Sequence, residues 1–271
     1  MHNTRKTYGG LSLTVLKKLR AALPKLQKLQ DQTLKLAQSK REKVENLLPP
    51  DFTWSELYEL SAKEMKILSM AIMGLLEPLA KAAREGLNLN EFIINEAMHS
   101  MESGEDDGDY TGGHGGMFSV PDMLALNYAN MGMMQGLFYY GHYMNDLVAM
   151  AKNGDDDAFF KAVRIDQTVL ACSSFSARLA RAKVFGEKKF MKRLLHAMKA
   201  KPHESLLMNQ DLRFMLQVLH EVKALPNLSL TEADLLFIQE LKVYSDSGVD
   251  PSRGLMRFIQ RWKAERPLST T

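Results

Sequence analysis

The sequence predicts an all-α fold, a multi-helix bundle around a central buried helix, preceded by a basic N-terminal helical hairpin or coiled-coil-like arm. Three observations lead to this class. A long apolar segment occupies residues 121–151, apolar residues recur at helical spacing over residues 11–48, and no segment shows the alternation typical of a strand. With typical helix lengths the chain is expected to hold about nine to eleven helices.

Residues 121–151 are predicted to form the central helix. The stretch between Asp122 and Asp146 contains no Lys, Arg, Asp or Glu, and apolar residues fall on every face. Gly132 and Gly136 continue a series of small residues that would let a neighbouring backbone approach closely. The segment is long enough to span a bilayer, but its asparagines, Gln135 and His142 would lack partners in lipid, so we expect no membrane contact.

The first 50 residues are predicted to form the arm, and residues 51–271 the bundle, with a boundary at Pro49-Pro50. A first helix should place its leucines on one side up to Leu23, and Pro24 should begin a second helix. Over residues 25–48 a narrow apolar seam is typical of a hairpin or coiled coil. Residues 11–48 are therefore the expected contact for a protein partner or a second copy, unless they only pack within the chain.

Further helices are expected along the bundle. Asn88 or Asn90 should begin a short one, and Asp155–Asp157 should provide the N-cap and first-turn acids for a helix over 158–185. Asp166 lies beside the apolar stripe of that helix, so its carboxylate should need a partner such as Arg164. Other helices are predicted over residues 55–86, with a kink or a restart at Pro78, over 187–201, 206–225 and 231–245, and after Pro251.

The net charge of +3 conceals a strong asymmetry along the chain. Residues 1–50 carry a net +8, residues 51–160 carry −13, residues 161–203 carry +9 and the remainder carries −1. Two basic blocks thus flank an acidic middle. Either the basic blocks fold back on the acidic one, or they face a polyanion such as nucleic acid.

The second basic block holds the candidate nucleic-acid-binding residues. Positive side chains end the predicted helix before Gly186, and in the following helix they should lie opposite Phe190, Leu194, Leu195 and Met198. The two helices match a helix-turn-helix motif poorly. We therefore expect them to contact phosphate groups and to distinguish little between base sequences. A merely solvated face is the competing interpretation. The candidates are Arg178, Arg181, Lys183, Lys189, Lys192, Arg193 and Lys199.

The acidic, glycine-rich segment 102–117 is expected to be a loop, and it contains the weak candidates for a metal site. Asp107 and Asp109 fit the first half of a calcium-binding loop, but Phe118 stands where a bidentate Glu is needed. His114 offers nitrogen to a transition metal instead. A flexible acidic loop is the simpler interpretation.

One further set of residues has metal-ligand spacing. Glu96 and His99 lie three apart, as in di-iron bundles, and His142 and Asp146 on the central helix could face them. No second Glu-x-x-His is present, so a hydrogen-bonded His142–Asp146 pair inside the bundle is the simpler expectation.

These patterns favour a non-enzymatic binding or scaffold protein that contacts nucleic acid through phosphates. An adaptor or assembly subunit acting through the arm is the first alternative, and a metal-dependent enzyme is the second. No catalytic residue and no cofactor is predicted. With one cysteine and no apolar leader segment, we expect a cytoplasmic protein, bacterial in character.

Overall fold

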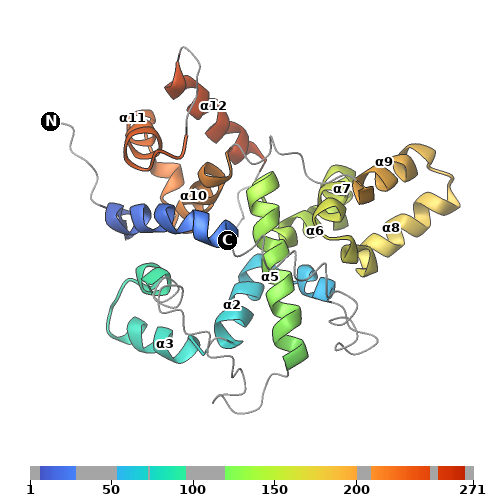
Figure 1. Cartoon of the computed structure of the whole chain (residues 1–271), viewed down its shortest axis with the longest axis horizontal. Helices are drawn as coiled ribbons and strands as arrows, with labels where there is room; N and C mark the ends of the chain where they lie inside the picture. The colour runs from blue at the N-terminus through green and yellow to red at the C-terminus, as the bar shows by residue number, and fades with distance from the viewer. Residues whose placement is uncertain are drawn as a thin grey trace. The chain divides into compact units, whose positions relative to one another are not determined.

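The computed structural model describes residues 7–28, 54–72, 74–95, 120–199, 209–244 and 250–265, and these are almost entirely helical. The predicted all-α class is confirmed. The chain divides into two compact units. Unit 1 comprises Met1–Leu26, Leu79–Glu105 and Met208–Thr271, whereas unit 2 comprises Gln27–Pro78 and Asp106–Leu207 (Figure 1).

Unit 1 begins with a minute antiparallel hairpin that the sequence analysis missed. Strand β1 (Thr7–Tyr8) pairs with β2 (Leu11–Ser12) across Gly9 and Gly10. Both glycines have positive φ, at 57° and 88°, which a two-residue hairpin turn requires. Strands of two residues are too short to show an alternating pattern.

The helix after this hairpin runs from residue 13 to the end of the described segment at residue 28, straight through Pro24. The predicted helix start at Pro24 is therefore wrong. As expected, Leu16, Leu19 and Leu23 are all buried. Leu16 and Leu19 enter a core formed mainly with the C-terminal helices, and the described part of the predicted arm up to Leu26 belongs to unit 1. Residues 29–50 lie outside the described part, where the arm and its boundary stay predictions.

The remaining elements of unit 1 form the other side of that core. Its members include Leu216, Phe237 and Trp262. Ser229 caps α11 with a complete capping box to Glu232, so the helix begins at Leu230, one residue before the predicted start. The elements are α10 (Gln210–Glu221), η4 (Leu225–Asn227), α11 (Leu230–Asp234), its π-helical continuation η5 (Leu235–Glu240) and α12 (Pro251–Ala264).

A short helical pair also belongs largely to unit 1. Helix α3 (Leu76–Arg84) starts in unit 2 and is followed, after Gly86, by a helix that begins at residue 89. Asn88 caps this second helix by accepting from the backbone N–H groups of Asn90 and Glu91, as predicted. The Asn88 side-chain amide also donates to the Gly10 carbonyl at 2.7 Å, which ties this pair to the β hairpin.

Unit 2 contains the apolar segment that was predicted to be one helix, but that helix is broken. Helix α5 (Val120–Tyr140) ends at Gly141, whose φ is +76°, and α6 (Met144–Lys152) begins three residues later. The turn folds back so closely that a Cβ on Gly136 would lie 2.6 Å from the His142 carbonyl oxygen. Gly136 thus does allow a close backbone approach, and the backbone that approaches is the chain's own next turn, whereas a Cβ on Gly132 would meet the Tyr58 side chain.

The rest of unit 2 surrounds these two helices. The 3₁₀ helix η1 (Trp54–Glu59) and α6 both contact α5, and α7 (Asp156–Ile165) packs on α6 and α9 (Lys188–Lys199). The other elements are α2 (Ala62–Ile72), the 3₁₀ helix η2 (Gln167–Ala171) and α8 (Ser173–Val184). Among the described side chains of α5, residues 125–140, Asn127 is the exposed one.

The predicted helix over 158–185 is also interrupted, at Asp166. This residue ends α7 and caps η2, because its Oδ1 accepts from the Thr168 N–H at 2.9 Å. Its Oδ2 accepts from Trp54 Nε1 at 2.8 Å and from the Tyr58 hydroxyl at 3.1 Å. The expected carboxylate partner was an arginine; the hydrogen-bond donors that the structure gives are two aromatic side chains and a backbone amide.

The same region buries two groups that titrate at alkaline pH. Burial raises the pKa of Cys172 from 9.0 to about 11. Burial and the neighbouring Asp166 carboxylate raise the pKa of Tyr58 well above its ordinary value. Both groups hold their protons more tightly in the folded chain than in the unfolded chain.

Alkaline pH is therefore expected to destabilise unit 2. The contribution of the protonated Cys172 thiol is complete below its unfolded pKa of 9.0 and is lost as the pH rises toward 11. Urea unfolding followed by Trp54 fluorescence at pH 8 and pH 10.5 measures the loss. The Cys172→Ala variant should show a smaller drop between the two pH values, and an equal drop would assign the effect elsewhere.

Candidate nucleic-acid interface

The predicted nucleic-acid-binding residues all lie on α8 and α9, which form a helical hairpin in unit 2 (gold in Figure 1). We call residues 173–199 the cationic hairpin. It carries eight Lys and Arg residues against one acid, Glu187. Phe190, Leu194 and Ala197 are its buried residues on α9. Leu195 and Met198, which were expected to face inward, are 55% and 37% exposed, so this part of the prediction is wrong.

The buried stripe of α9 determines where its charges point. Lys188, Lys192 and Lys199 lie at four- and seven-residue steps, half a turn around the helix from Phe190 and Leu194. Lys189, Arg193 and His196 form the adjacent stripe. All six side chains are exposed. A continuous cationic face therefore runs along the helix, and it includes Lys188, which was not among the predicted residues.

Arg178 is the candidate that the structure engages most within the chain. Its Nε and one terminal nitrogen each donate to Asp156 at 2.9 Å, and its terminal nitrogens donate to Glu187 at 3.2 and 2.8 Å. These hydrogen bonds raise the pKa of Arg178 above its ordinary value. The guanidinium carbon also lies 3.9 Å from the centre of the Phe190 ring. Arg178 thus joins α7, α8 and α9.

Arg193 has a second internal partner set, also on α7. Its guanidinium pairs with Asp157 and lies 4.4 Å from the centre of the Phe160 ring. The hydrogen bond and charge of Arg193 lower the pKa of Asp157. Because the two side chains are 55% and 70% exposed, this pair remains accessible to solvent and contributes little to stability.

The three consecutive acids at the start of α7 therefore divide their roles. Asp155 is the N-cap, as predicted, and accepts from the N–H groups of Asp157 and Ala158 at 2.8 and 3.0 Å. Asp156 and Asp157 bind Arg178 and Arg193, two of the three arginines of the cationic hairpin. The acidic middle of the chain thus neutralises part of the basic block. The charge asymmetry left open that the basic block folds back on the acidic middle, but the individual pairs were not predicted, because the partners lie 22 and 36 residues apart.

The remaining positive side chains of the cationic hairpin are exposed, and the structure shows no ion pair from them to any described residue. They extend from the end of α8 to the end of α9. They are Arg181, Lys183, Lys188, Lys189, Lys192 and Lys199. Five of them were predicted from the sequence as nucleic-acid contacts.

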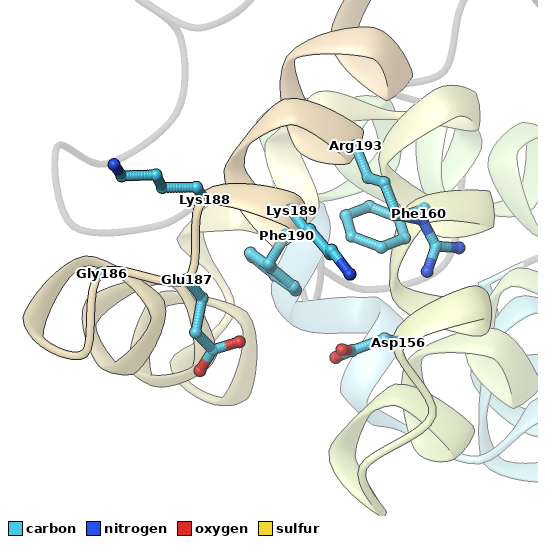
Figure 2. A pocket seen from close by; sticks show the side chains of 8 residues that line it. All are labelled: Asp156, Phe160, Gly186, Glu187, Lys188, Lys189, Phe190 and Arg193. Carbon is cyan, nitrogen blue, oxygen red and sulfur yellow. The ribbon is translucent and has the colours of Figure 1, made fainter.

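An open pocket of about 460 Å³ lies where α7 meets the start of α9. Phe160 and Phe190 form its apolar part, and Figure 2 shows Lys189 directed across Phe190 while Lys188 extends away from the pocket. The carboxylates of Asp156 and Glu187 share the lining with Lys189 and Arg193. This mixed lining separates it from the uniformly positive outer face of α9.

The candidate metal residues cannot be placed in the same way. Asp107, Asp109 and His114 lie outside the described residues, as do Glu96 and His99. His142 is buried, but it lies between α5 and α6, so it does not share one helix with Asp146 as predicted. Within the described ranges no group of three metal-ligating side chains comes together.

Comparisons add no further functional information. In the part of the chain that the structure describes, no helix is long and apolar enough to cross a membrane. No protein-family model, no curated protein and no solved structure matches this chain.

Proposed function

We propose that this chain is a non-enzymatic binding or scaffold protein whose cationic hairpin contacts nucleic acid through phosphate groups. The observation that carries this proposal is the outer face of α9. Lys188, Lys192 and Lys199 stand in line, exposed, on the side opposite the buried stripe. Each ammonium group can displace a counterion from a phosphate, and that release drives non-specific nucleic-acid binding.

The arrangement favours backbone contacts over base reading. Lysine is a point charge that suits phosphate, whereas bidentate recognition of base edges relies on arginine, asparagine and glutamine. Two of the three arginines of the hairpin, Arg178 and Arg193, already contact carboxylates. Affinity should therefore depend strongly on salt and weakly on sequence.

The test is a charge reversal of the α9 face. In the variant Lys188→Glu, Lys192→Glu, Lys199→Glu, binding to a mixed-sequence oligonucleotide should weaken by roughly 100-fold or more at low salt. The slope of log affinity against log salt should lose about 2–3 units, one contact for each lysine. Fluorescence anisotropy across a salt series measures both quantities.

The matched control reverses three exposed lysines elsewhere, Lys63→Glu, Lys81→Glu and Lys152→Glu, with the same change in net charge. This control should retain most of the affinity. Equal loss in the two triple variants would show that only net charge matters. Binding that does not change with salt would overturn the phosphate contact itself.

A further inference from the structure

The tip of the cationic hairpin exposes two adjacent apolar side chains. Val184 is 80% exposed and Phe185 is 73% exposed. An aromatic ring in water at the end of an otherwise well-packed hairpin is unusual, because folding normally buries rings of this size. The exposure follows from the way in which α8 ends.

The end of α8 is a rigid turn. Gly186 has φ +64°, its N–H donates to the Lys183 carbonyl at 3.3 Å, and the Glu187 N–H donates to the Ala182 carbonyl at 2.9 Å. These are the two hydrogen bonds of a Schellman motif. Glu187 is also held by Arg178, so both sides of the turn are fixed. The backbone of Phe185 is therefore already held in place before a ligand binds.

Positively charged residues flank Phe185 along the chain. Arg181 precedes Phe185 by one helical turn on α8, and Lys183, Lys188 and Lys189 lie within four residues of it. The one acid in this stretch, Glu187, is paired with Arg178. An occupant of the tip must therefore offer negative charge together with an apolar or aromatic face.

We infer that Phe185 is a stacking platform for an unpaired base, so that the cationic hairpin binds single-stranded nucleic acid in preference to a duplex. This inference rests on the proposed function. Bases in a duplex are already stacked on both faces, whereas an unpaired base can lie on an aromatic ring while cations hold its phosphates. The lysines along α9 supply those phosphate contacts, and Phe185 supplies the aromatic ring on which the base lies.

An anionic membrane surface is the competing occupant for a tip of this composition. Headgroups at the tip would engage only the cations close to Phe185 and not those farther along α9. In this chain the cations continue along α9 from Lys188 to Lys199, a rise of about 16 Å. A row of cations that extends away from one aromatic ring fits a single strand of nucleic acid, whose phosphates and bases also form a row.

The test compares Phe185→Ala with a matched control, Leu195→Ala. Leu195 is 55% exposed and lies between the lysines of the α9 face, so its removal takes away apolar surface but no aromatic ring. Phe185→Ala should weaken binding to an oligothymidine strand by about 10-fold, the effect of losing one stacked base. Its binding to a duplex of equal length and to heparin should be unchanged. Leu195→Ala should leave all three affinities within about two-fold, because it removes no stacking partner.

A spectroscopic readout separates stacking from a general effect on the surface. In Phe185→Trp the added indole should be quenched by the oligothymidine strand and not by heparin, while the affinity for the strand is retained. Thermal unfolding of Phe185→Ala should match that of the unmodified chain, because the ring is exposed.

The outcomes distinguish this inference from the proposed function. If the unmodified chain binds neither heparin nor any oligonucleotide, the proposed function fails and the inference fails with it. If it binds all three probes and Phe185→Ala changes none of them, or weakens all equally, only the inference is overturned. Loss of binding to phosphatidylserine vesicles in Phe185→Ala, with strand binding intact, would assign the tip to a membrane surface.

Discussion

Replacement of Phe159 by alanine is expected to destabilise unit 2 by about 3–5 kcal/mol, the usual cost of deleting a buried ring. Phe159 is 1% exposed. It stacks on Phe175 at 4.4 Å between ring centres and lies 5.6 Å from Phe160 and 5.2 Å from Phe190. These four rings join α7, α8 and α9, so the cavity would open where the cationic hairpin attaches to the rest of unit 2.

The matched control for Phe159→Ala is Phe185→Ala, the same chemical change at a ring that is 73% exposed. The surface change should alter the free energy of unfolding by less than about 0.5 kcal/mol. Urea unfolding followed by Trp54 fluorescence, in a Trp262→Phe background that silences unit 1, measures both. Similar values for the two variants would mean that the four rings are not the core of this region.

Replacement of Asp166 by alanine is expected to destabilise unit 2 by about 3 kcal/mol. The carboxylate accepts from Trp54, Tyr58 and the Thr168 amide, and its removal leaves the buried indole and phenol donors without an acceptor. It also removes the cap of η2. Hydrogen bonds to a charged group contribute more than neutral ones, and an unsatisfied buried donor adds its desolvation penalty.

Two further variants test the cause of that loss. Asp166→Asn keeps one acceptor oxygen and should recover part of the stability. Asp157→Ala removes an exposed carboxylate that pairs with Arg193, and should cost less than about 1 kcal/mol. If Asp166→Ala were no more destabilising than Asp157→Ala, the three hydrogen bonds would contribute nothing net. The emission of Trp54 should also shift in Asp166→Ala, since its indole loses its partner.

Local patterns in the sequence predicted the helical class and several helix starts correctly. Asn88 and Asp155 were recognisable because a side-chain cap needs only its own next three residues. The leucines up to Leu23 were recognisable because apolar residues on the buried face of a helix recur at helical spacing. Each of these features depends on residues that are neighbours along the chain.

Two of the errors concern backbone breaks that are determined by packing in the folded chain. The breaks at Gly141 and Asp166 occur inside apolar stretches, where tertiary contacts determine the backbone. At Gly136 the backbone of His142 packs against α5. At Asp166 the side chains of Trp54 and Tyr58, both in η1, donate hydrogen bonds to the carboxylate. Helical periodicity cannot reveal a partner more than 100 residues away.

The candidate interface was predicted in part for the same reason. Exposed lysines such as Lys192 are visible as the polar face of an amphipathic helix. The neutralisation of Arg178 and Arg193 by α7 was not visible, since it requires the packing of three helices. Phe185 was also not predicted as a contact, because the sequence does not show whether a single phenylalanine ring is exposed or buried.

The order of segments in unit 1 has a consequence for biosynthesis. Leu16 belongs to a core whose other members include Leu216, and unit 2 is translated between them. At about 5–20 residues per second, a ribosome needs about 10–40 s to make the intervening 200 residues. Over that interval the N-terminal leucines leave the exit tunnel without their native partners. Unit 2 can complete its fold during translation, whereas the core of unit 1 can form only after the C-terminal helices have been synthesised.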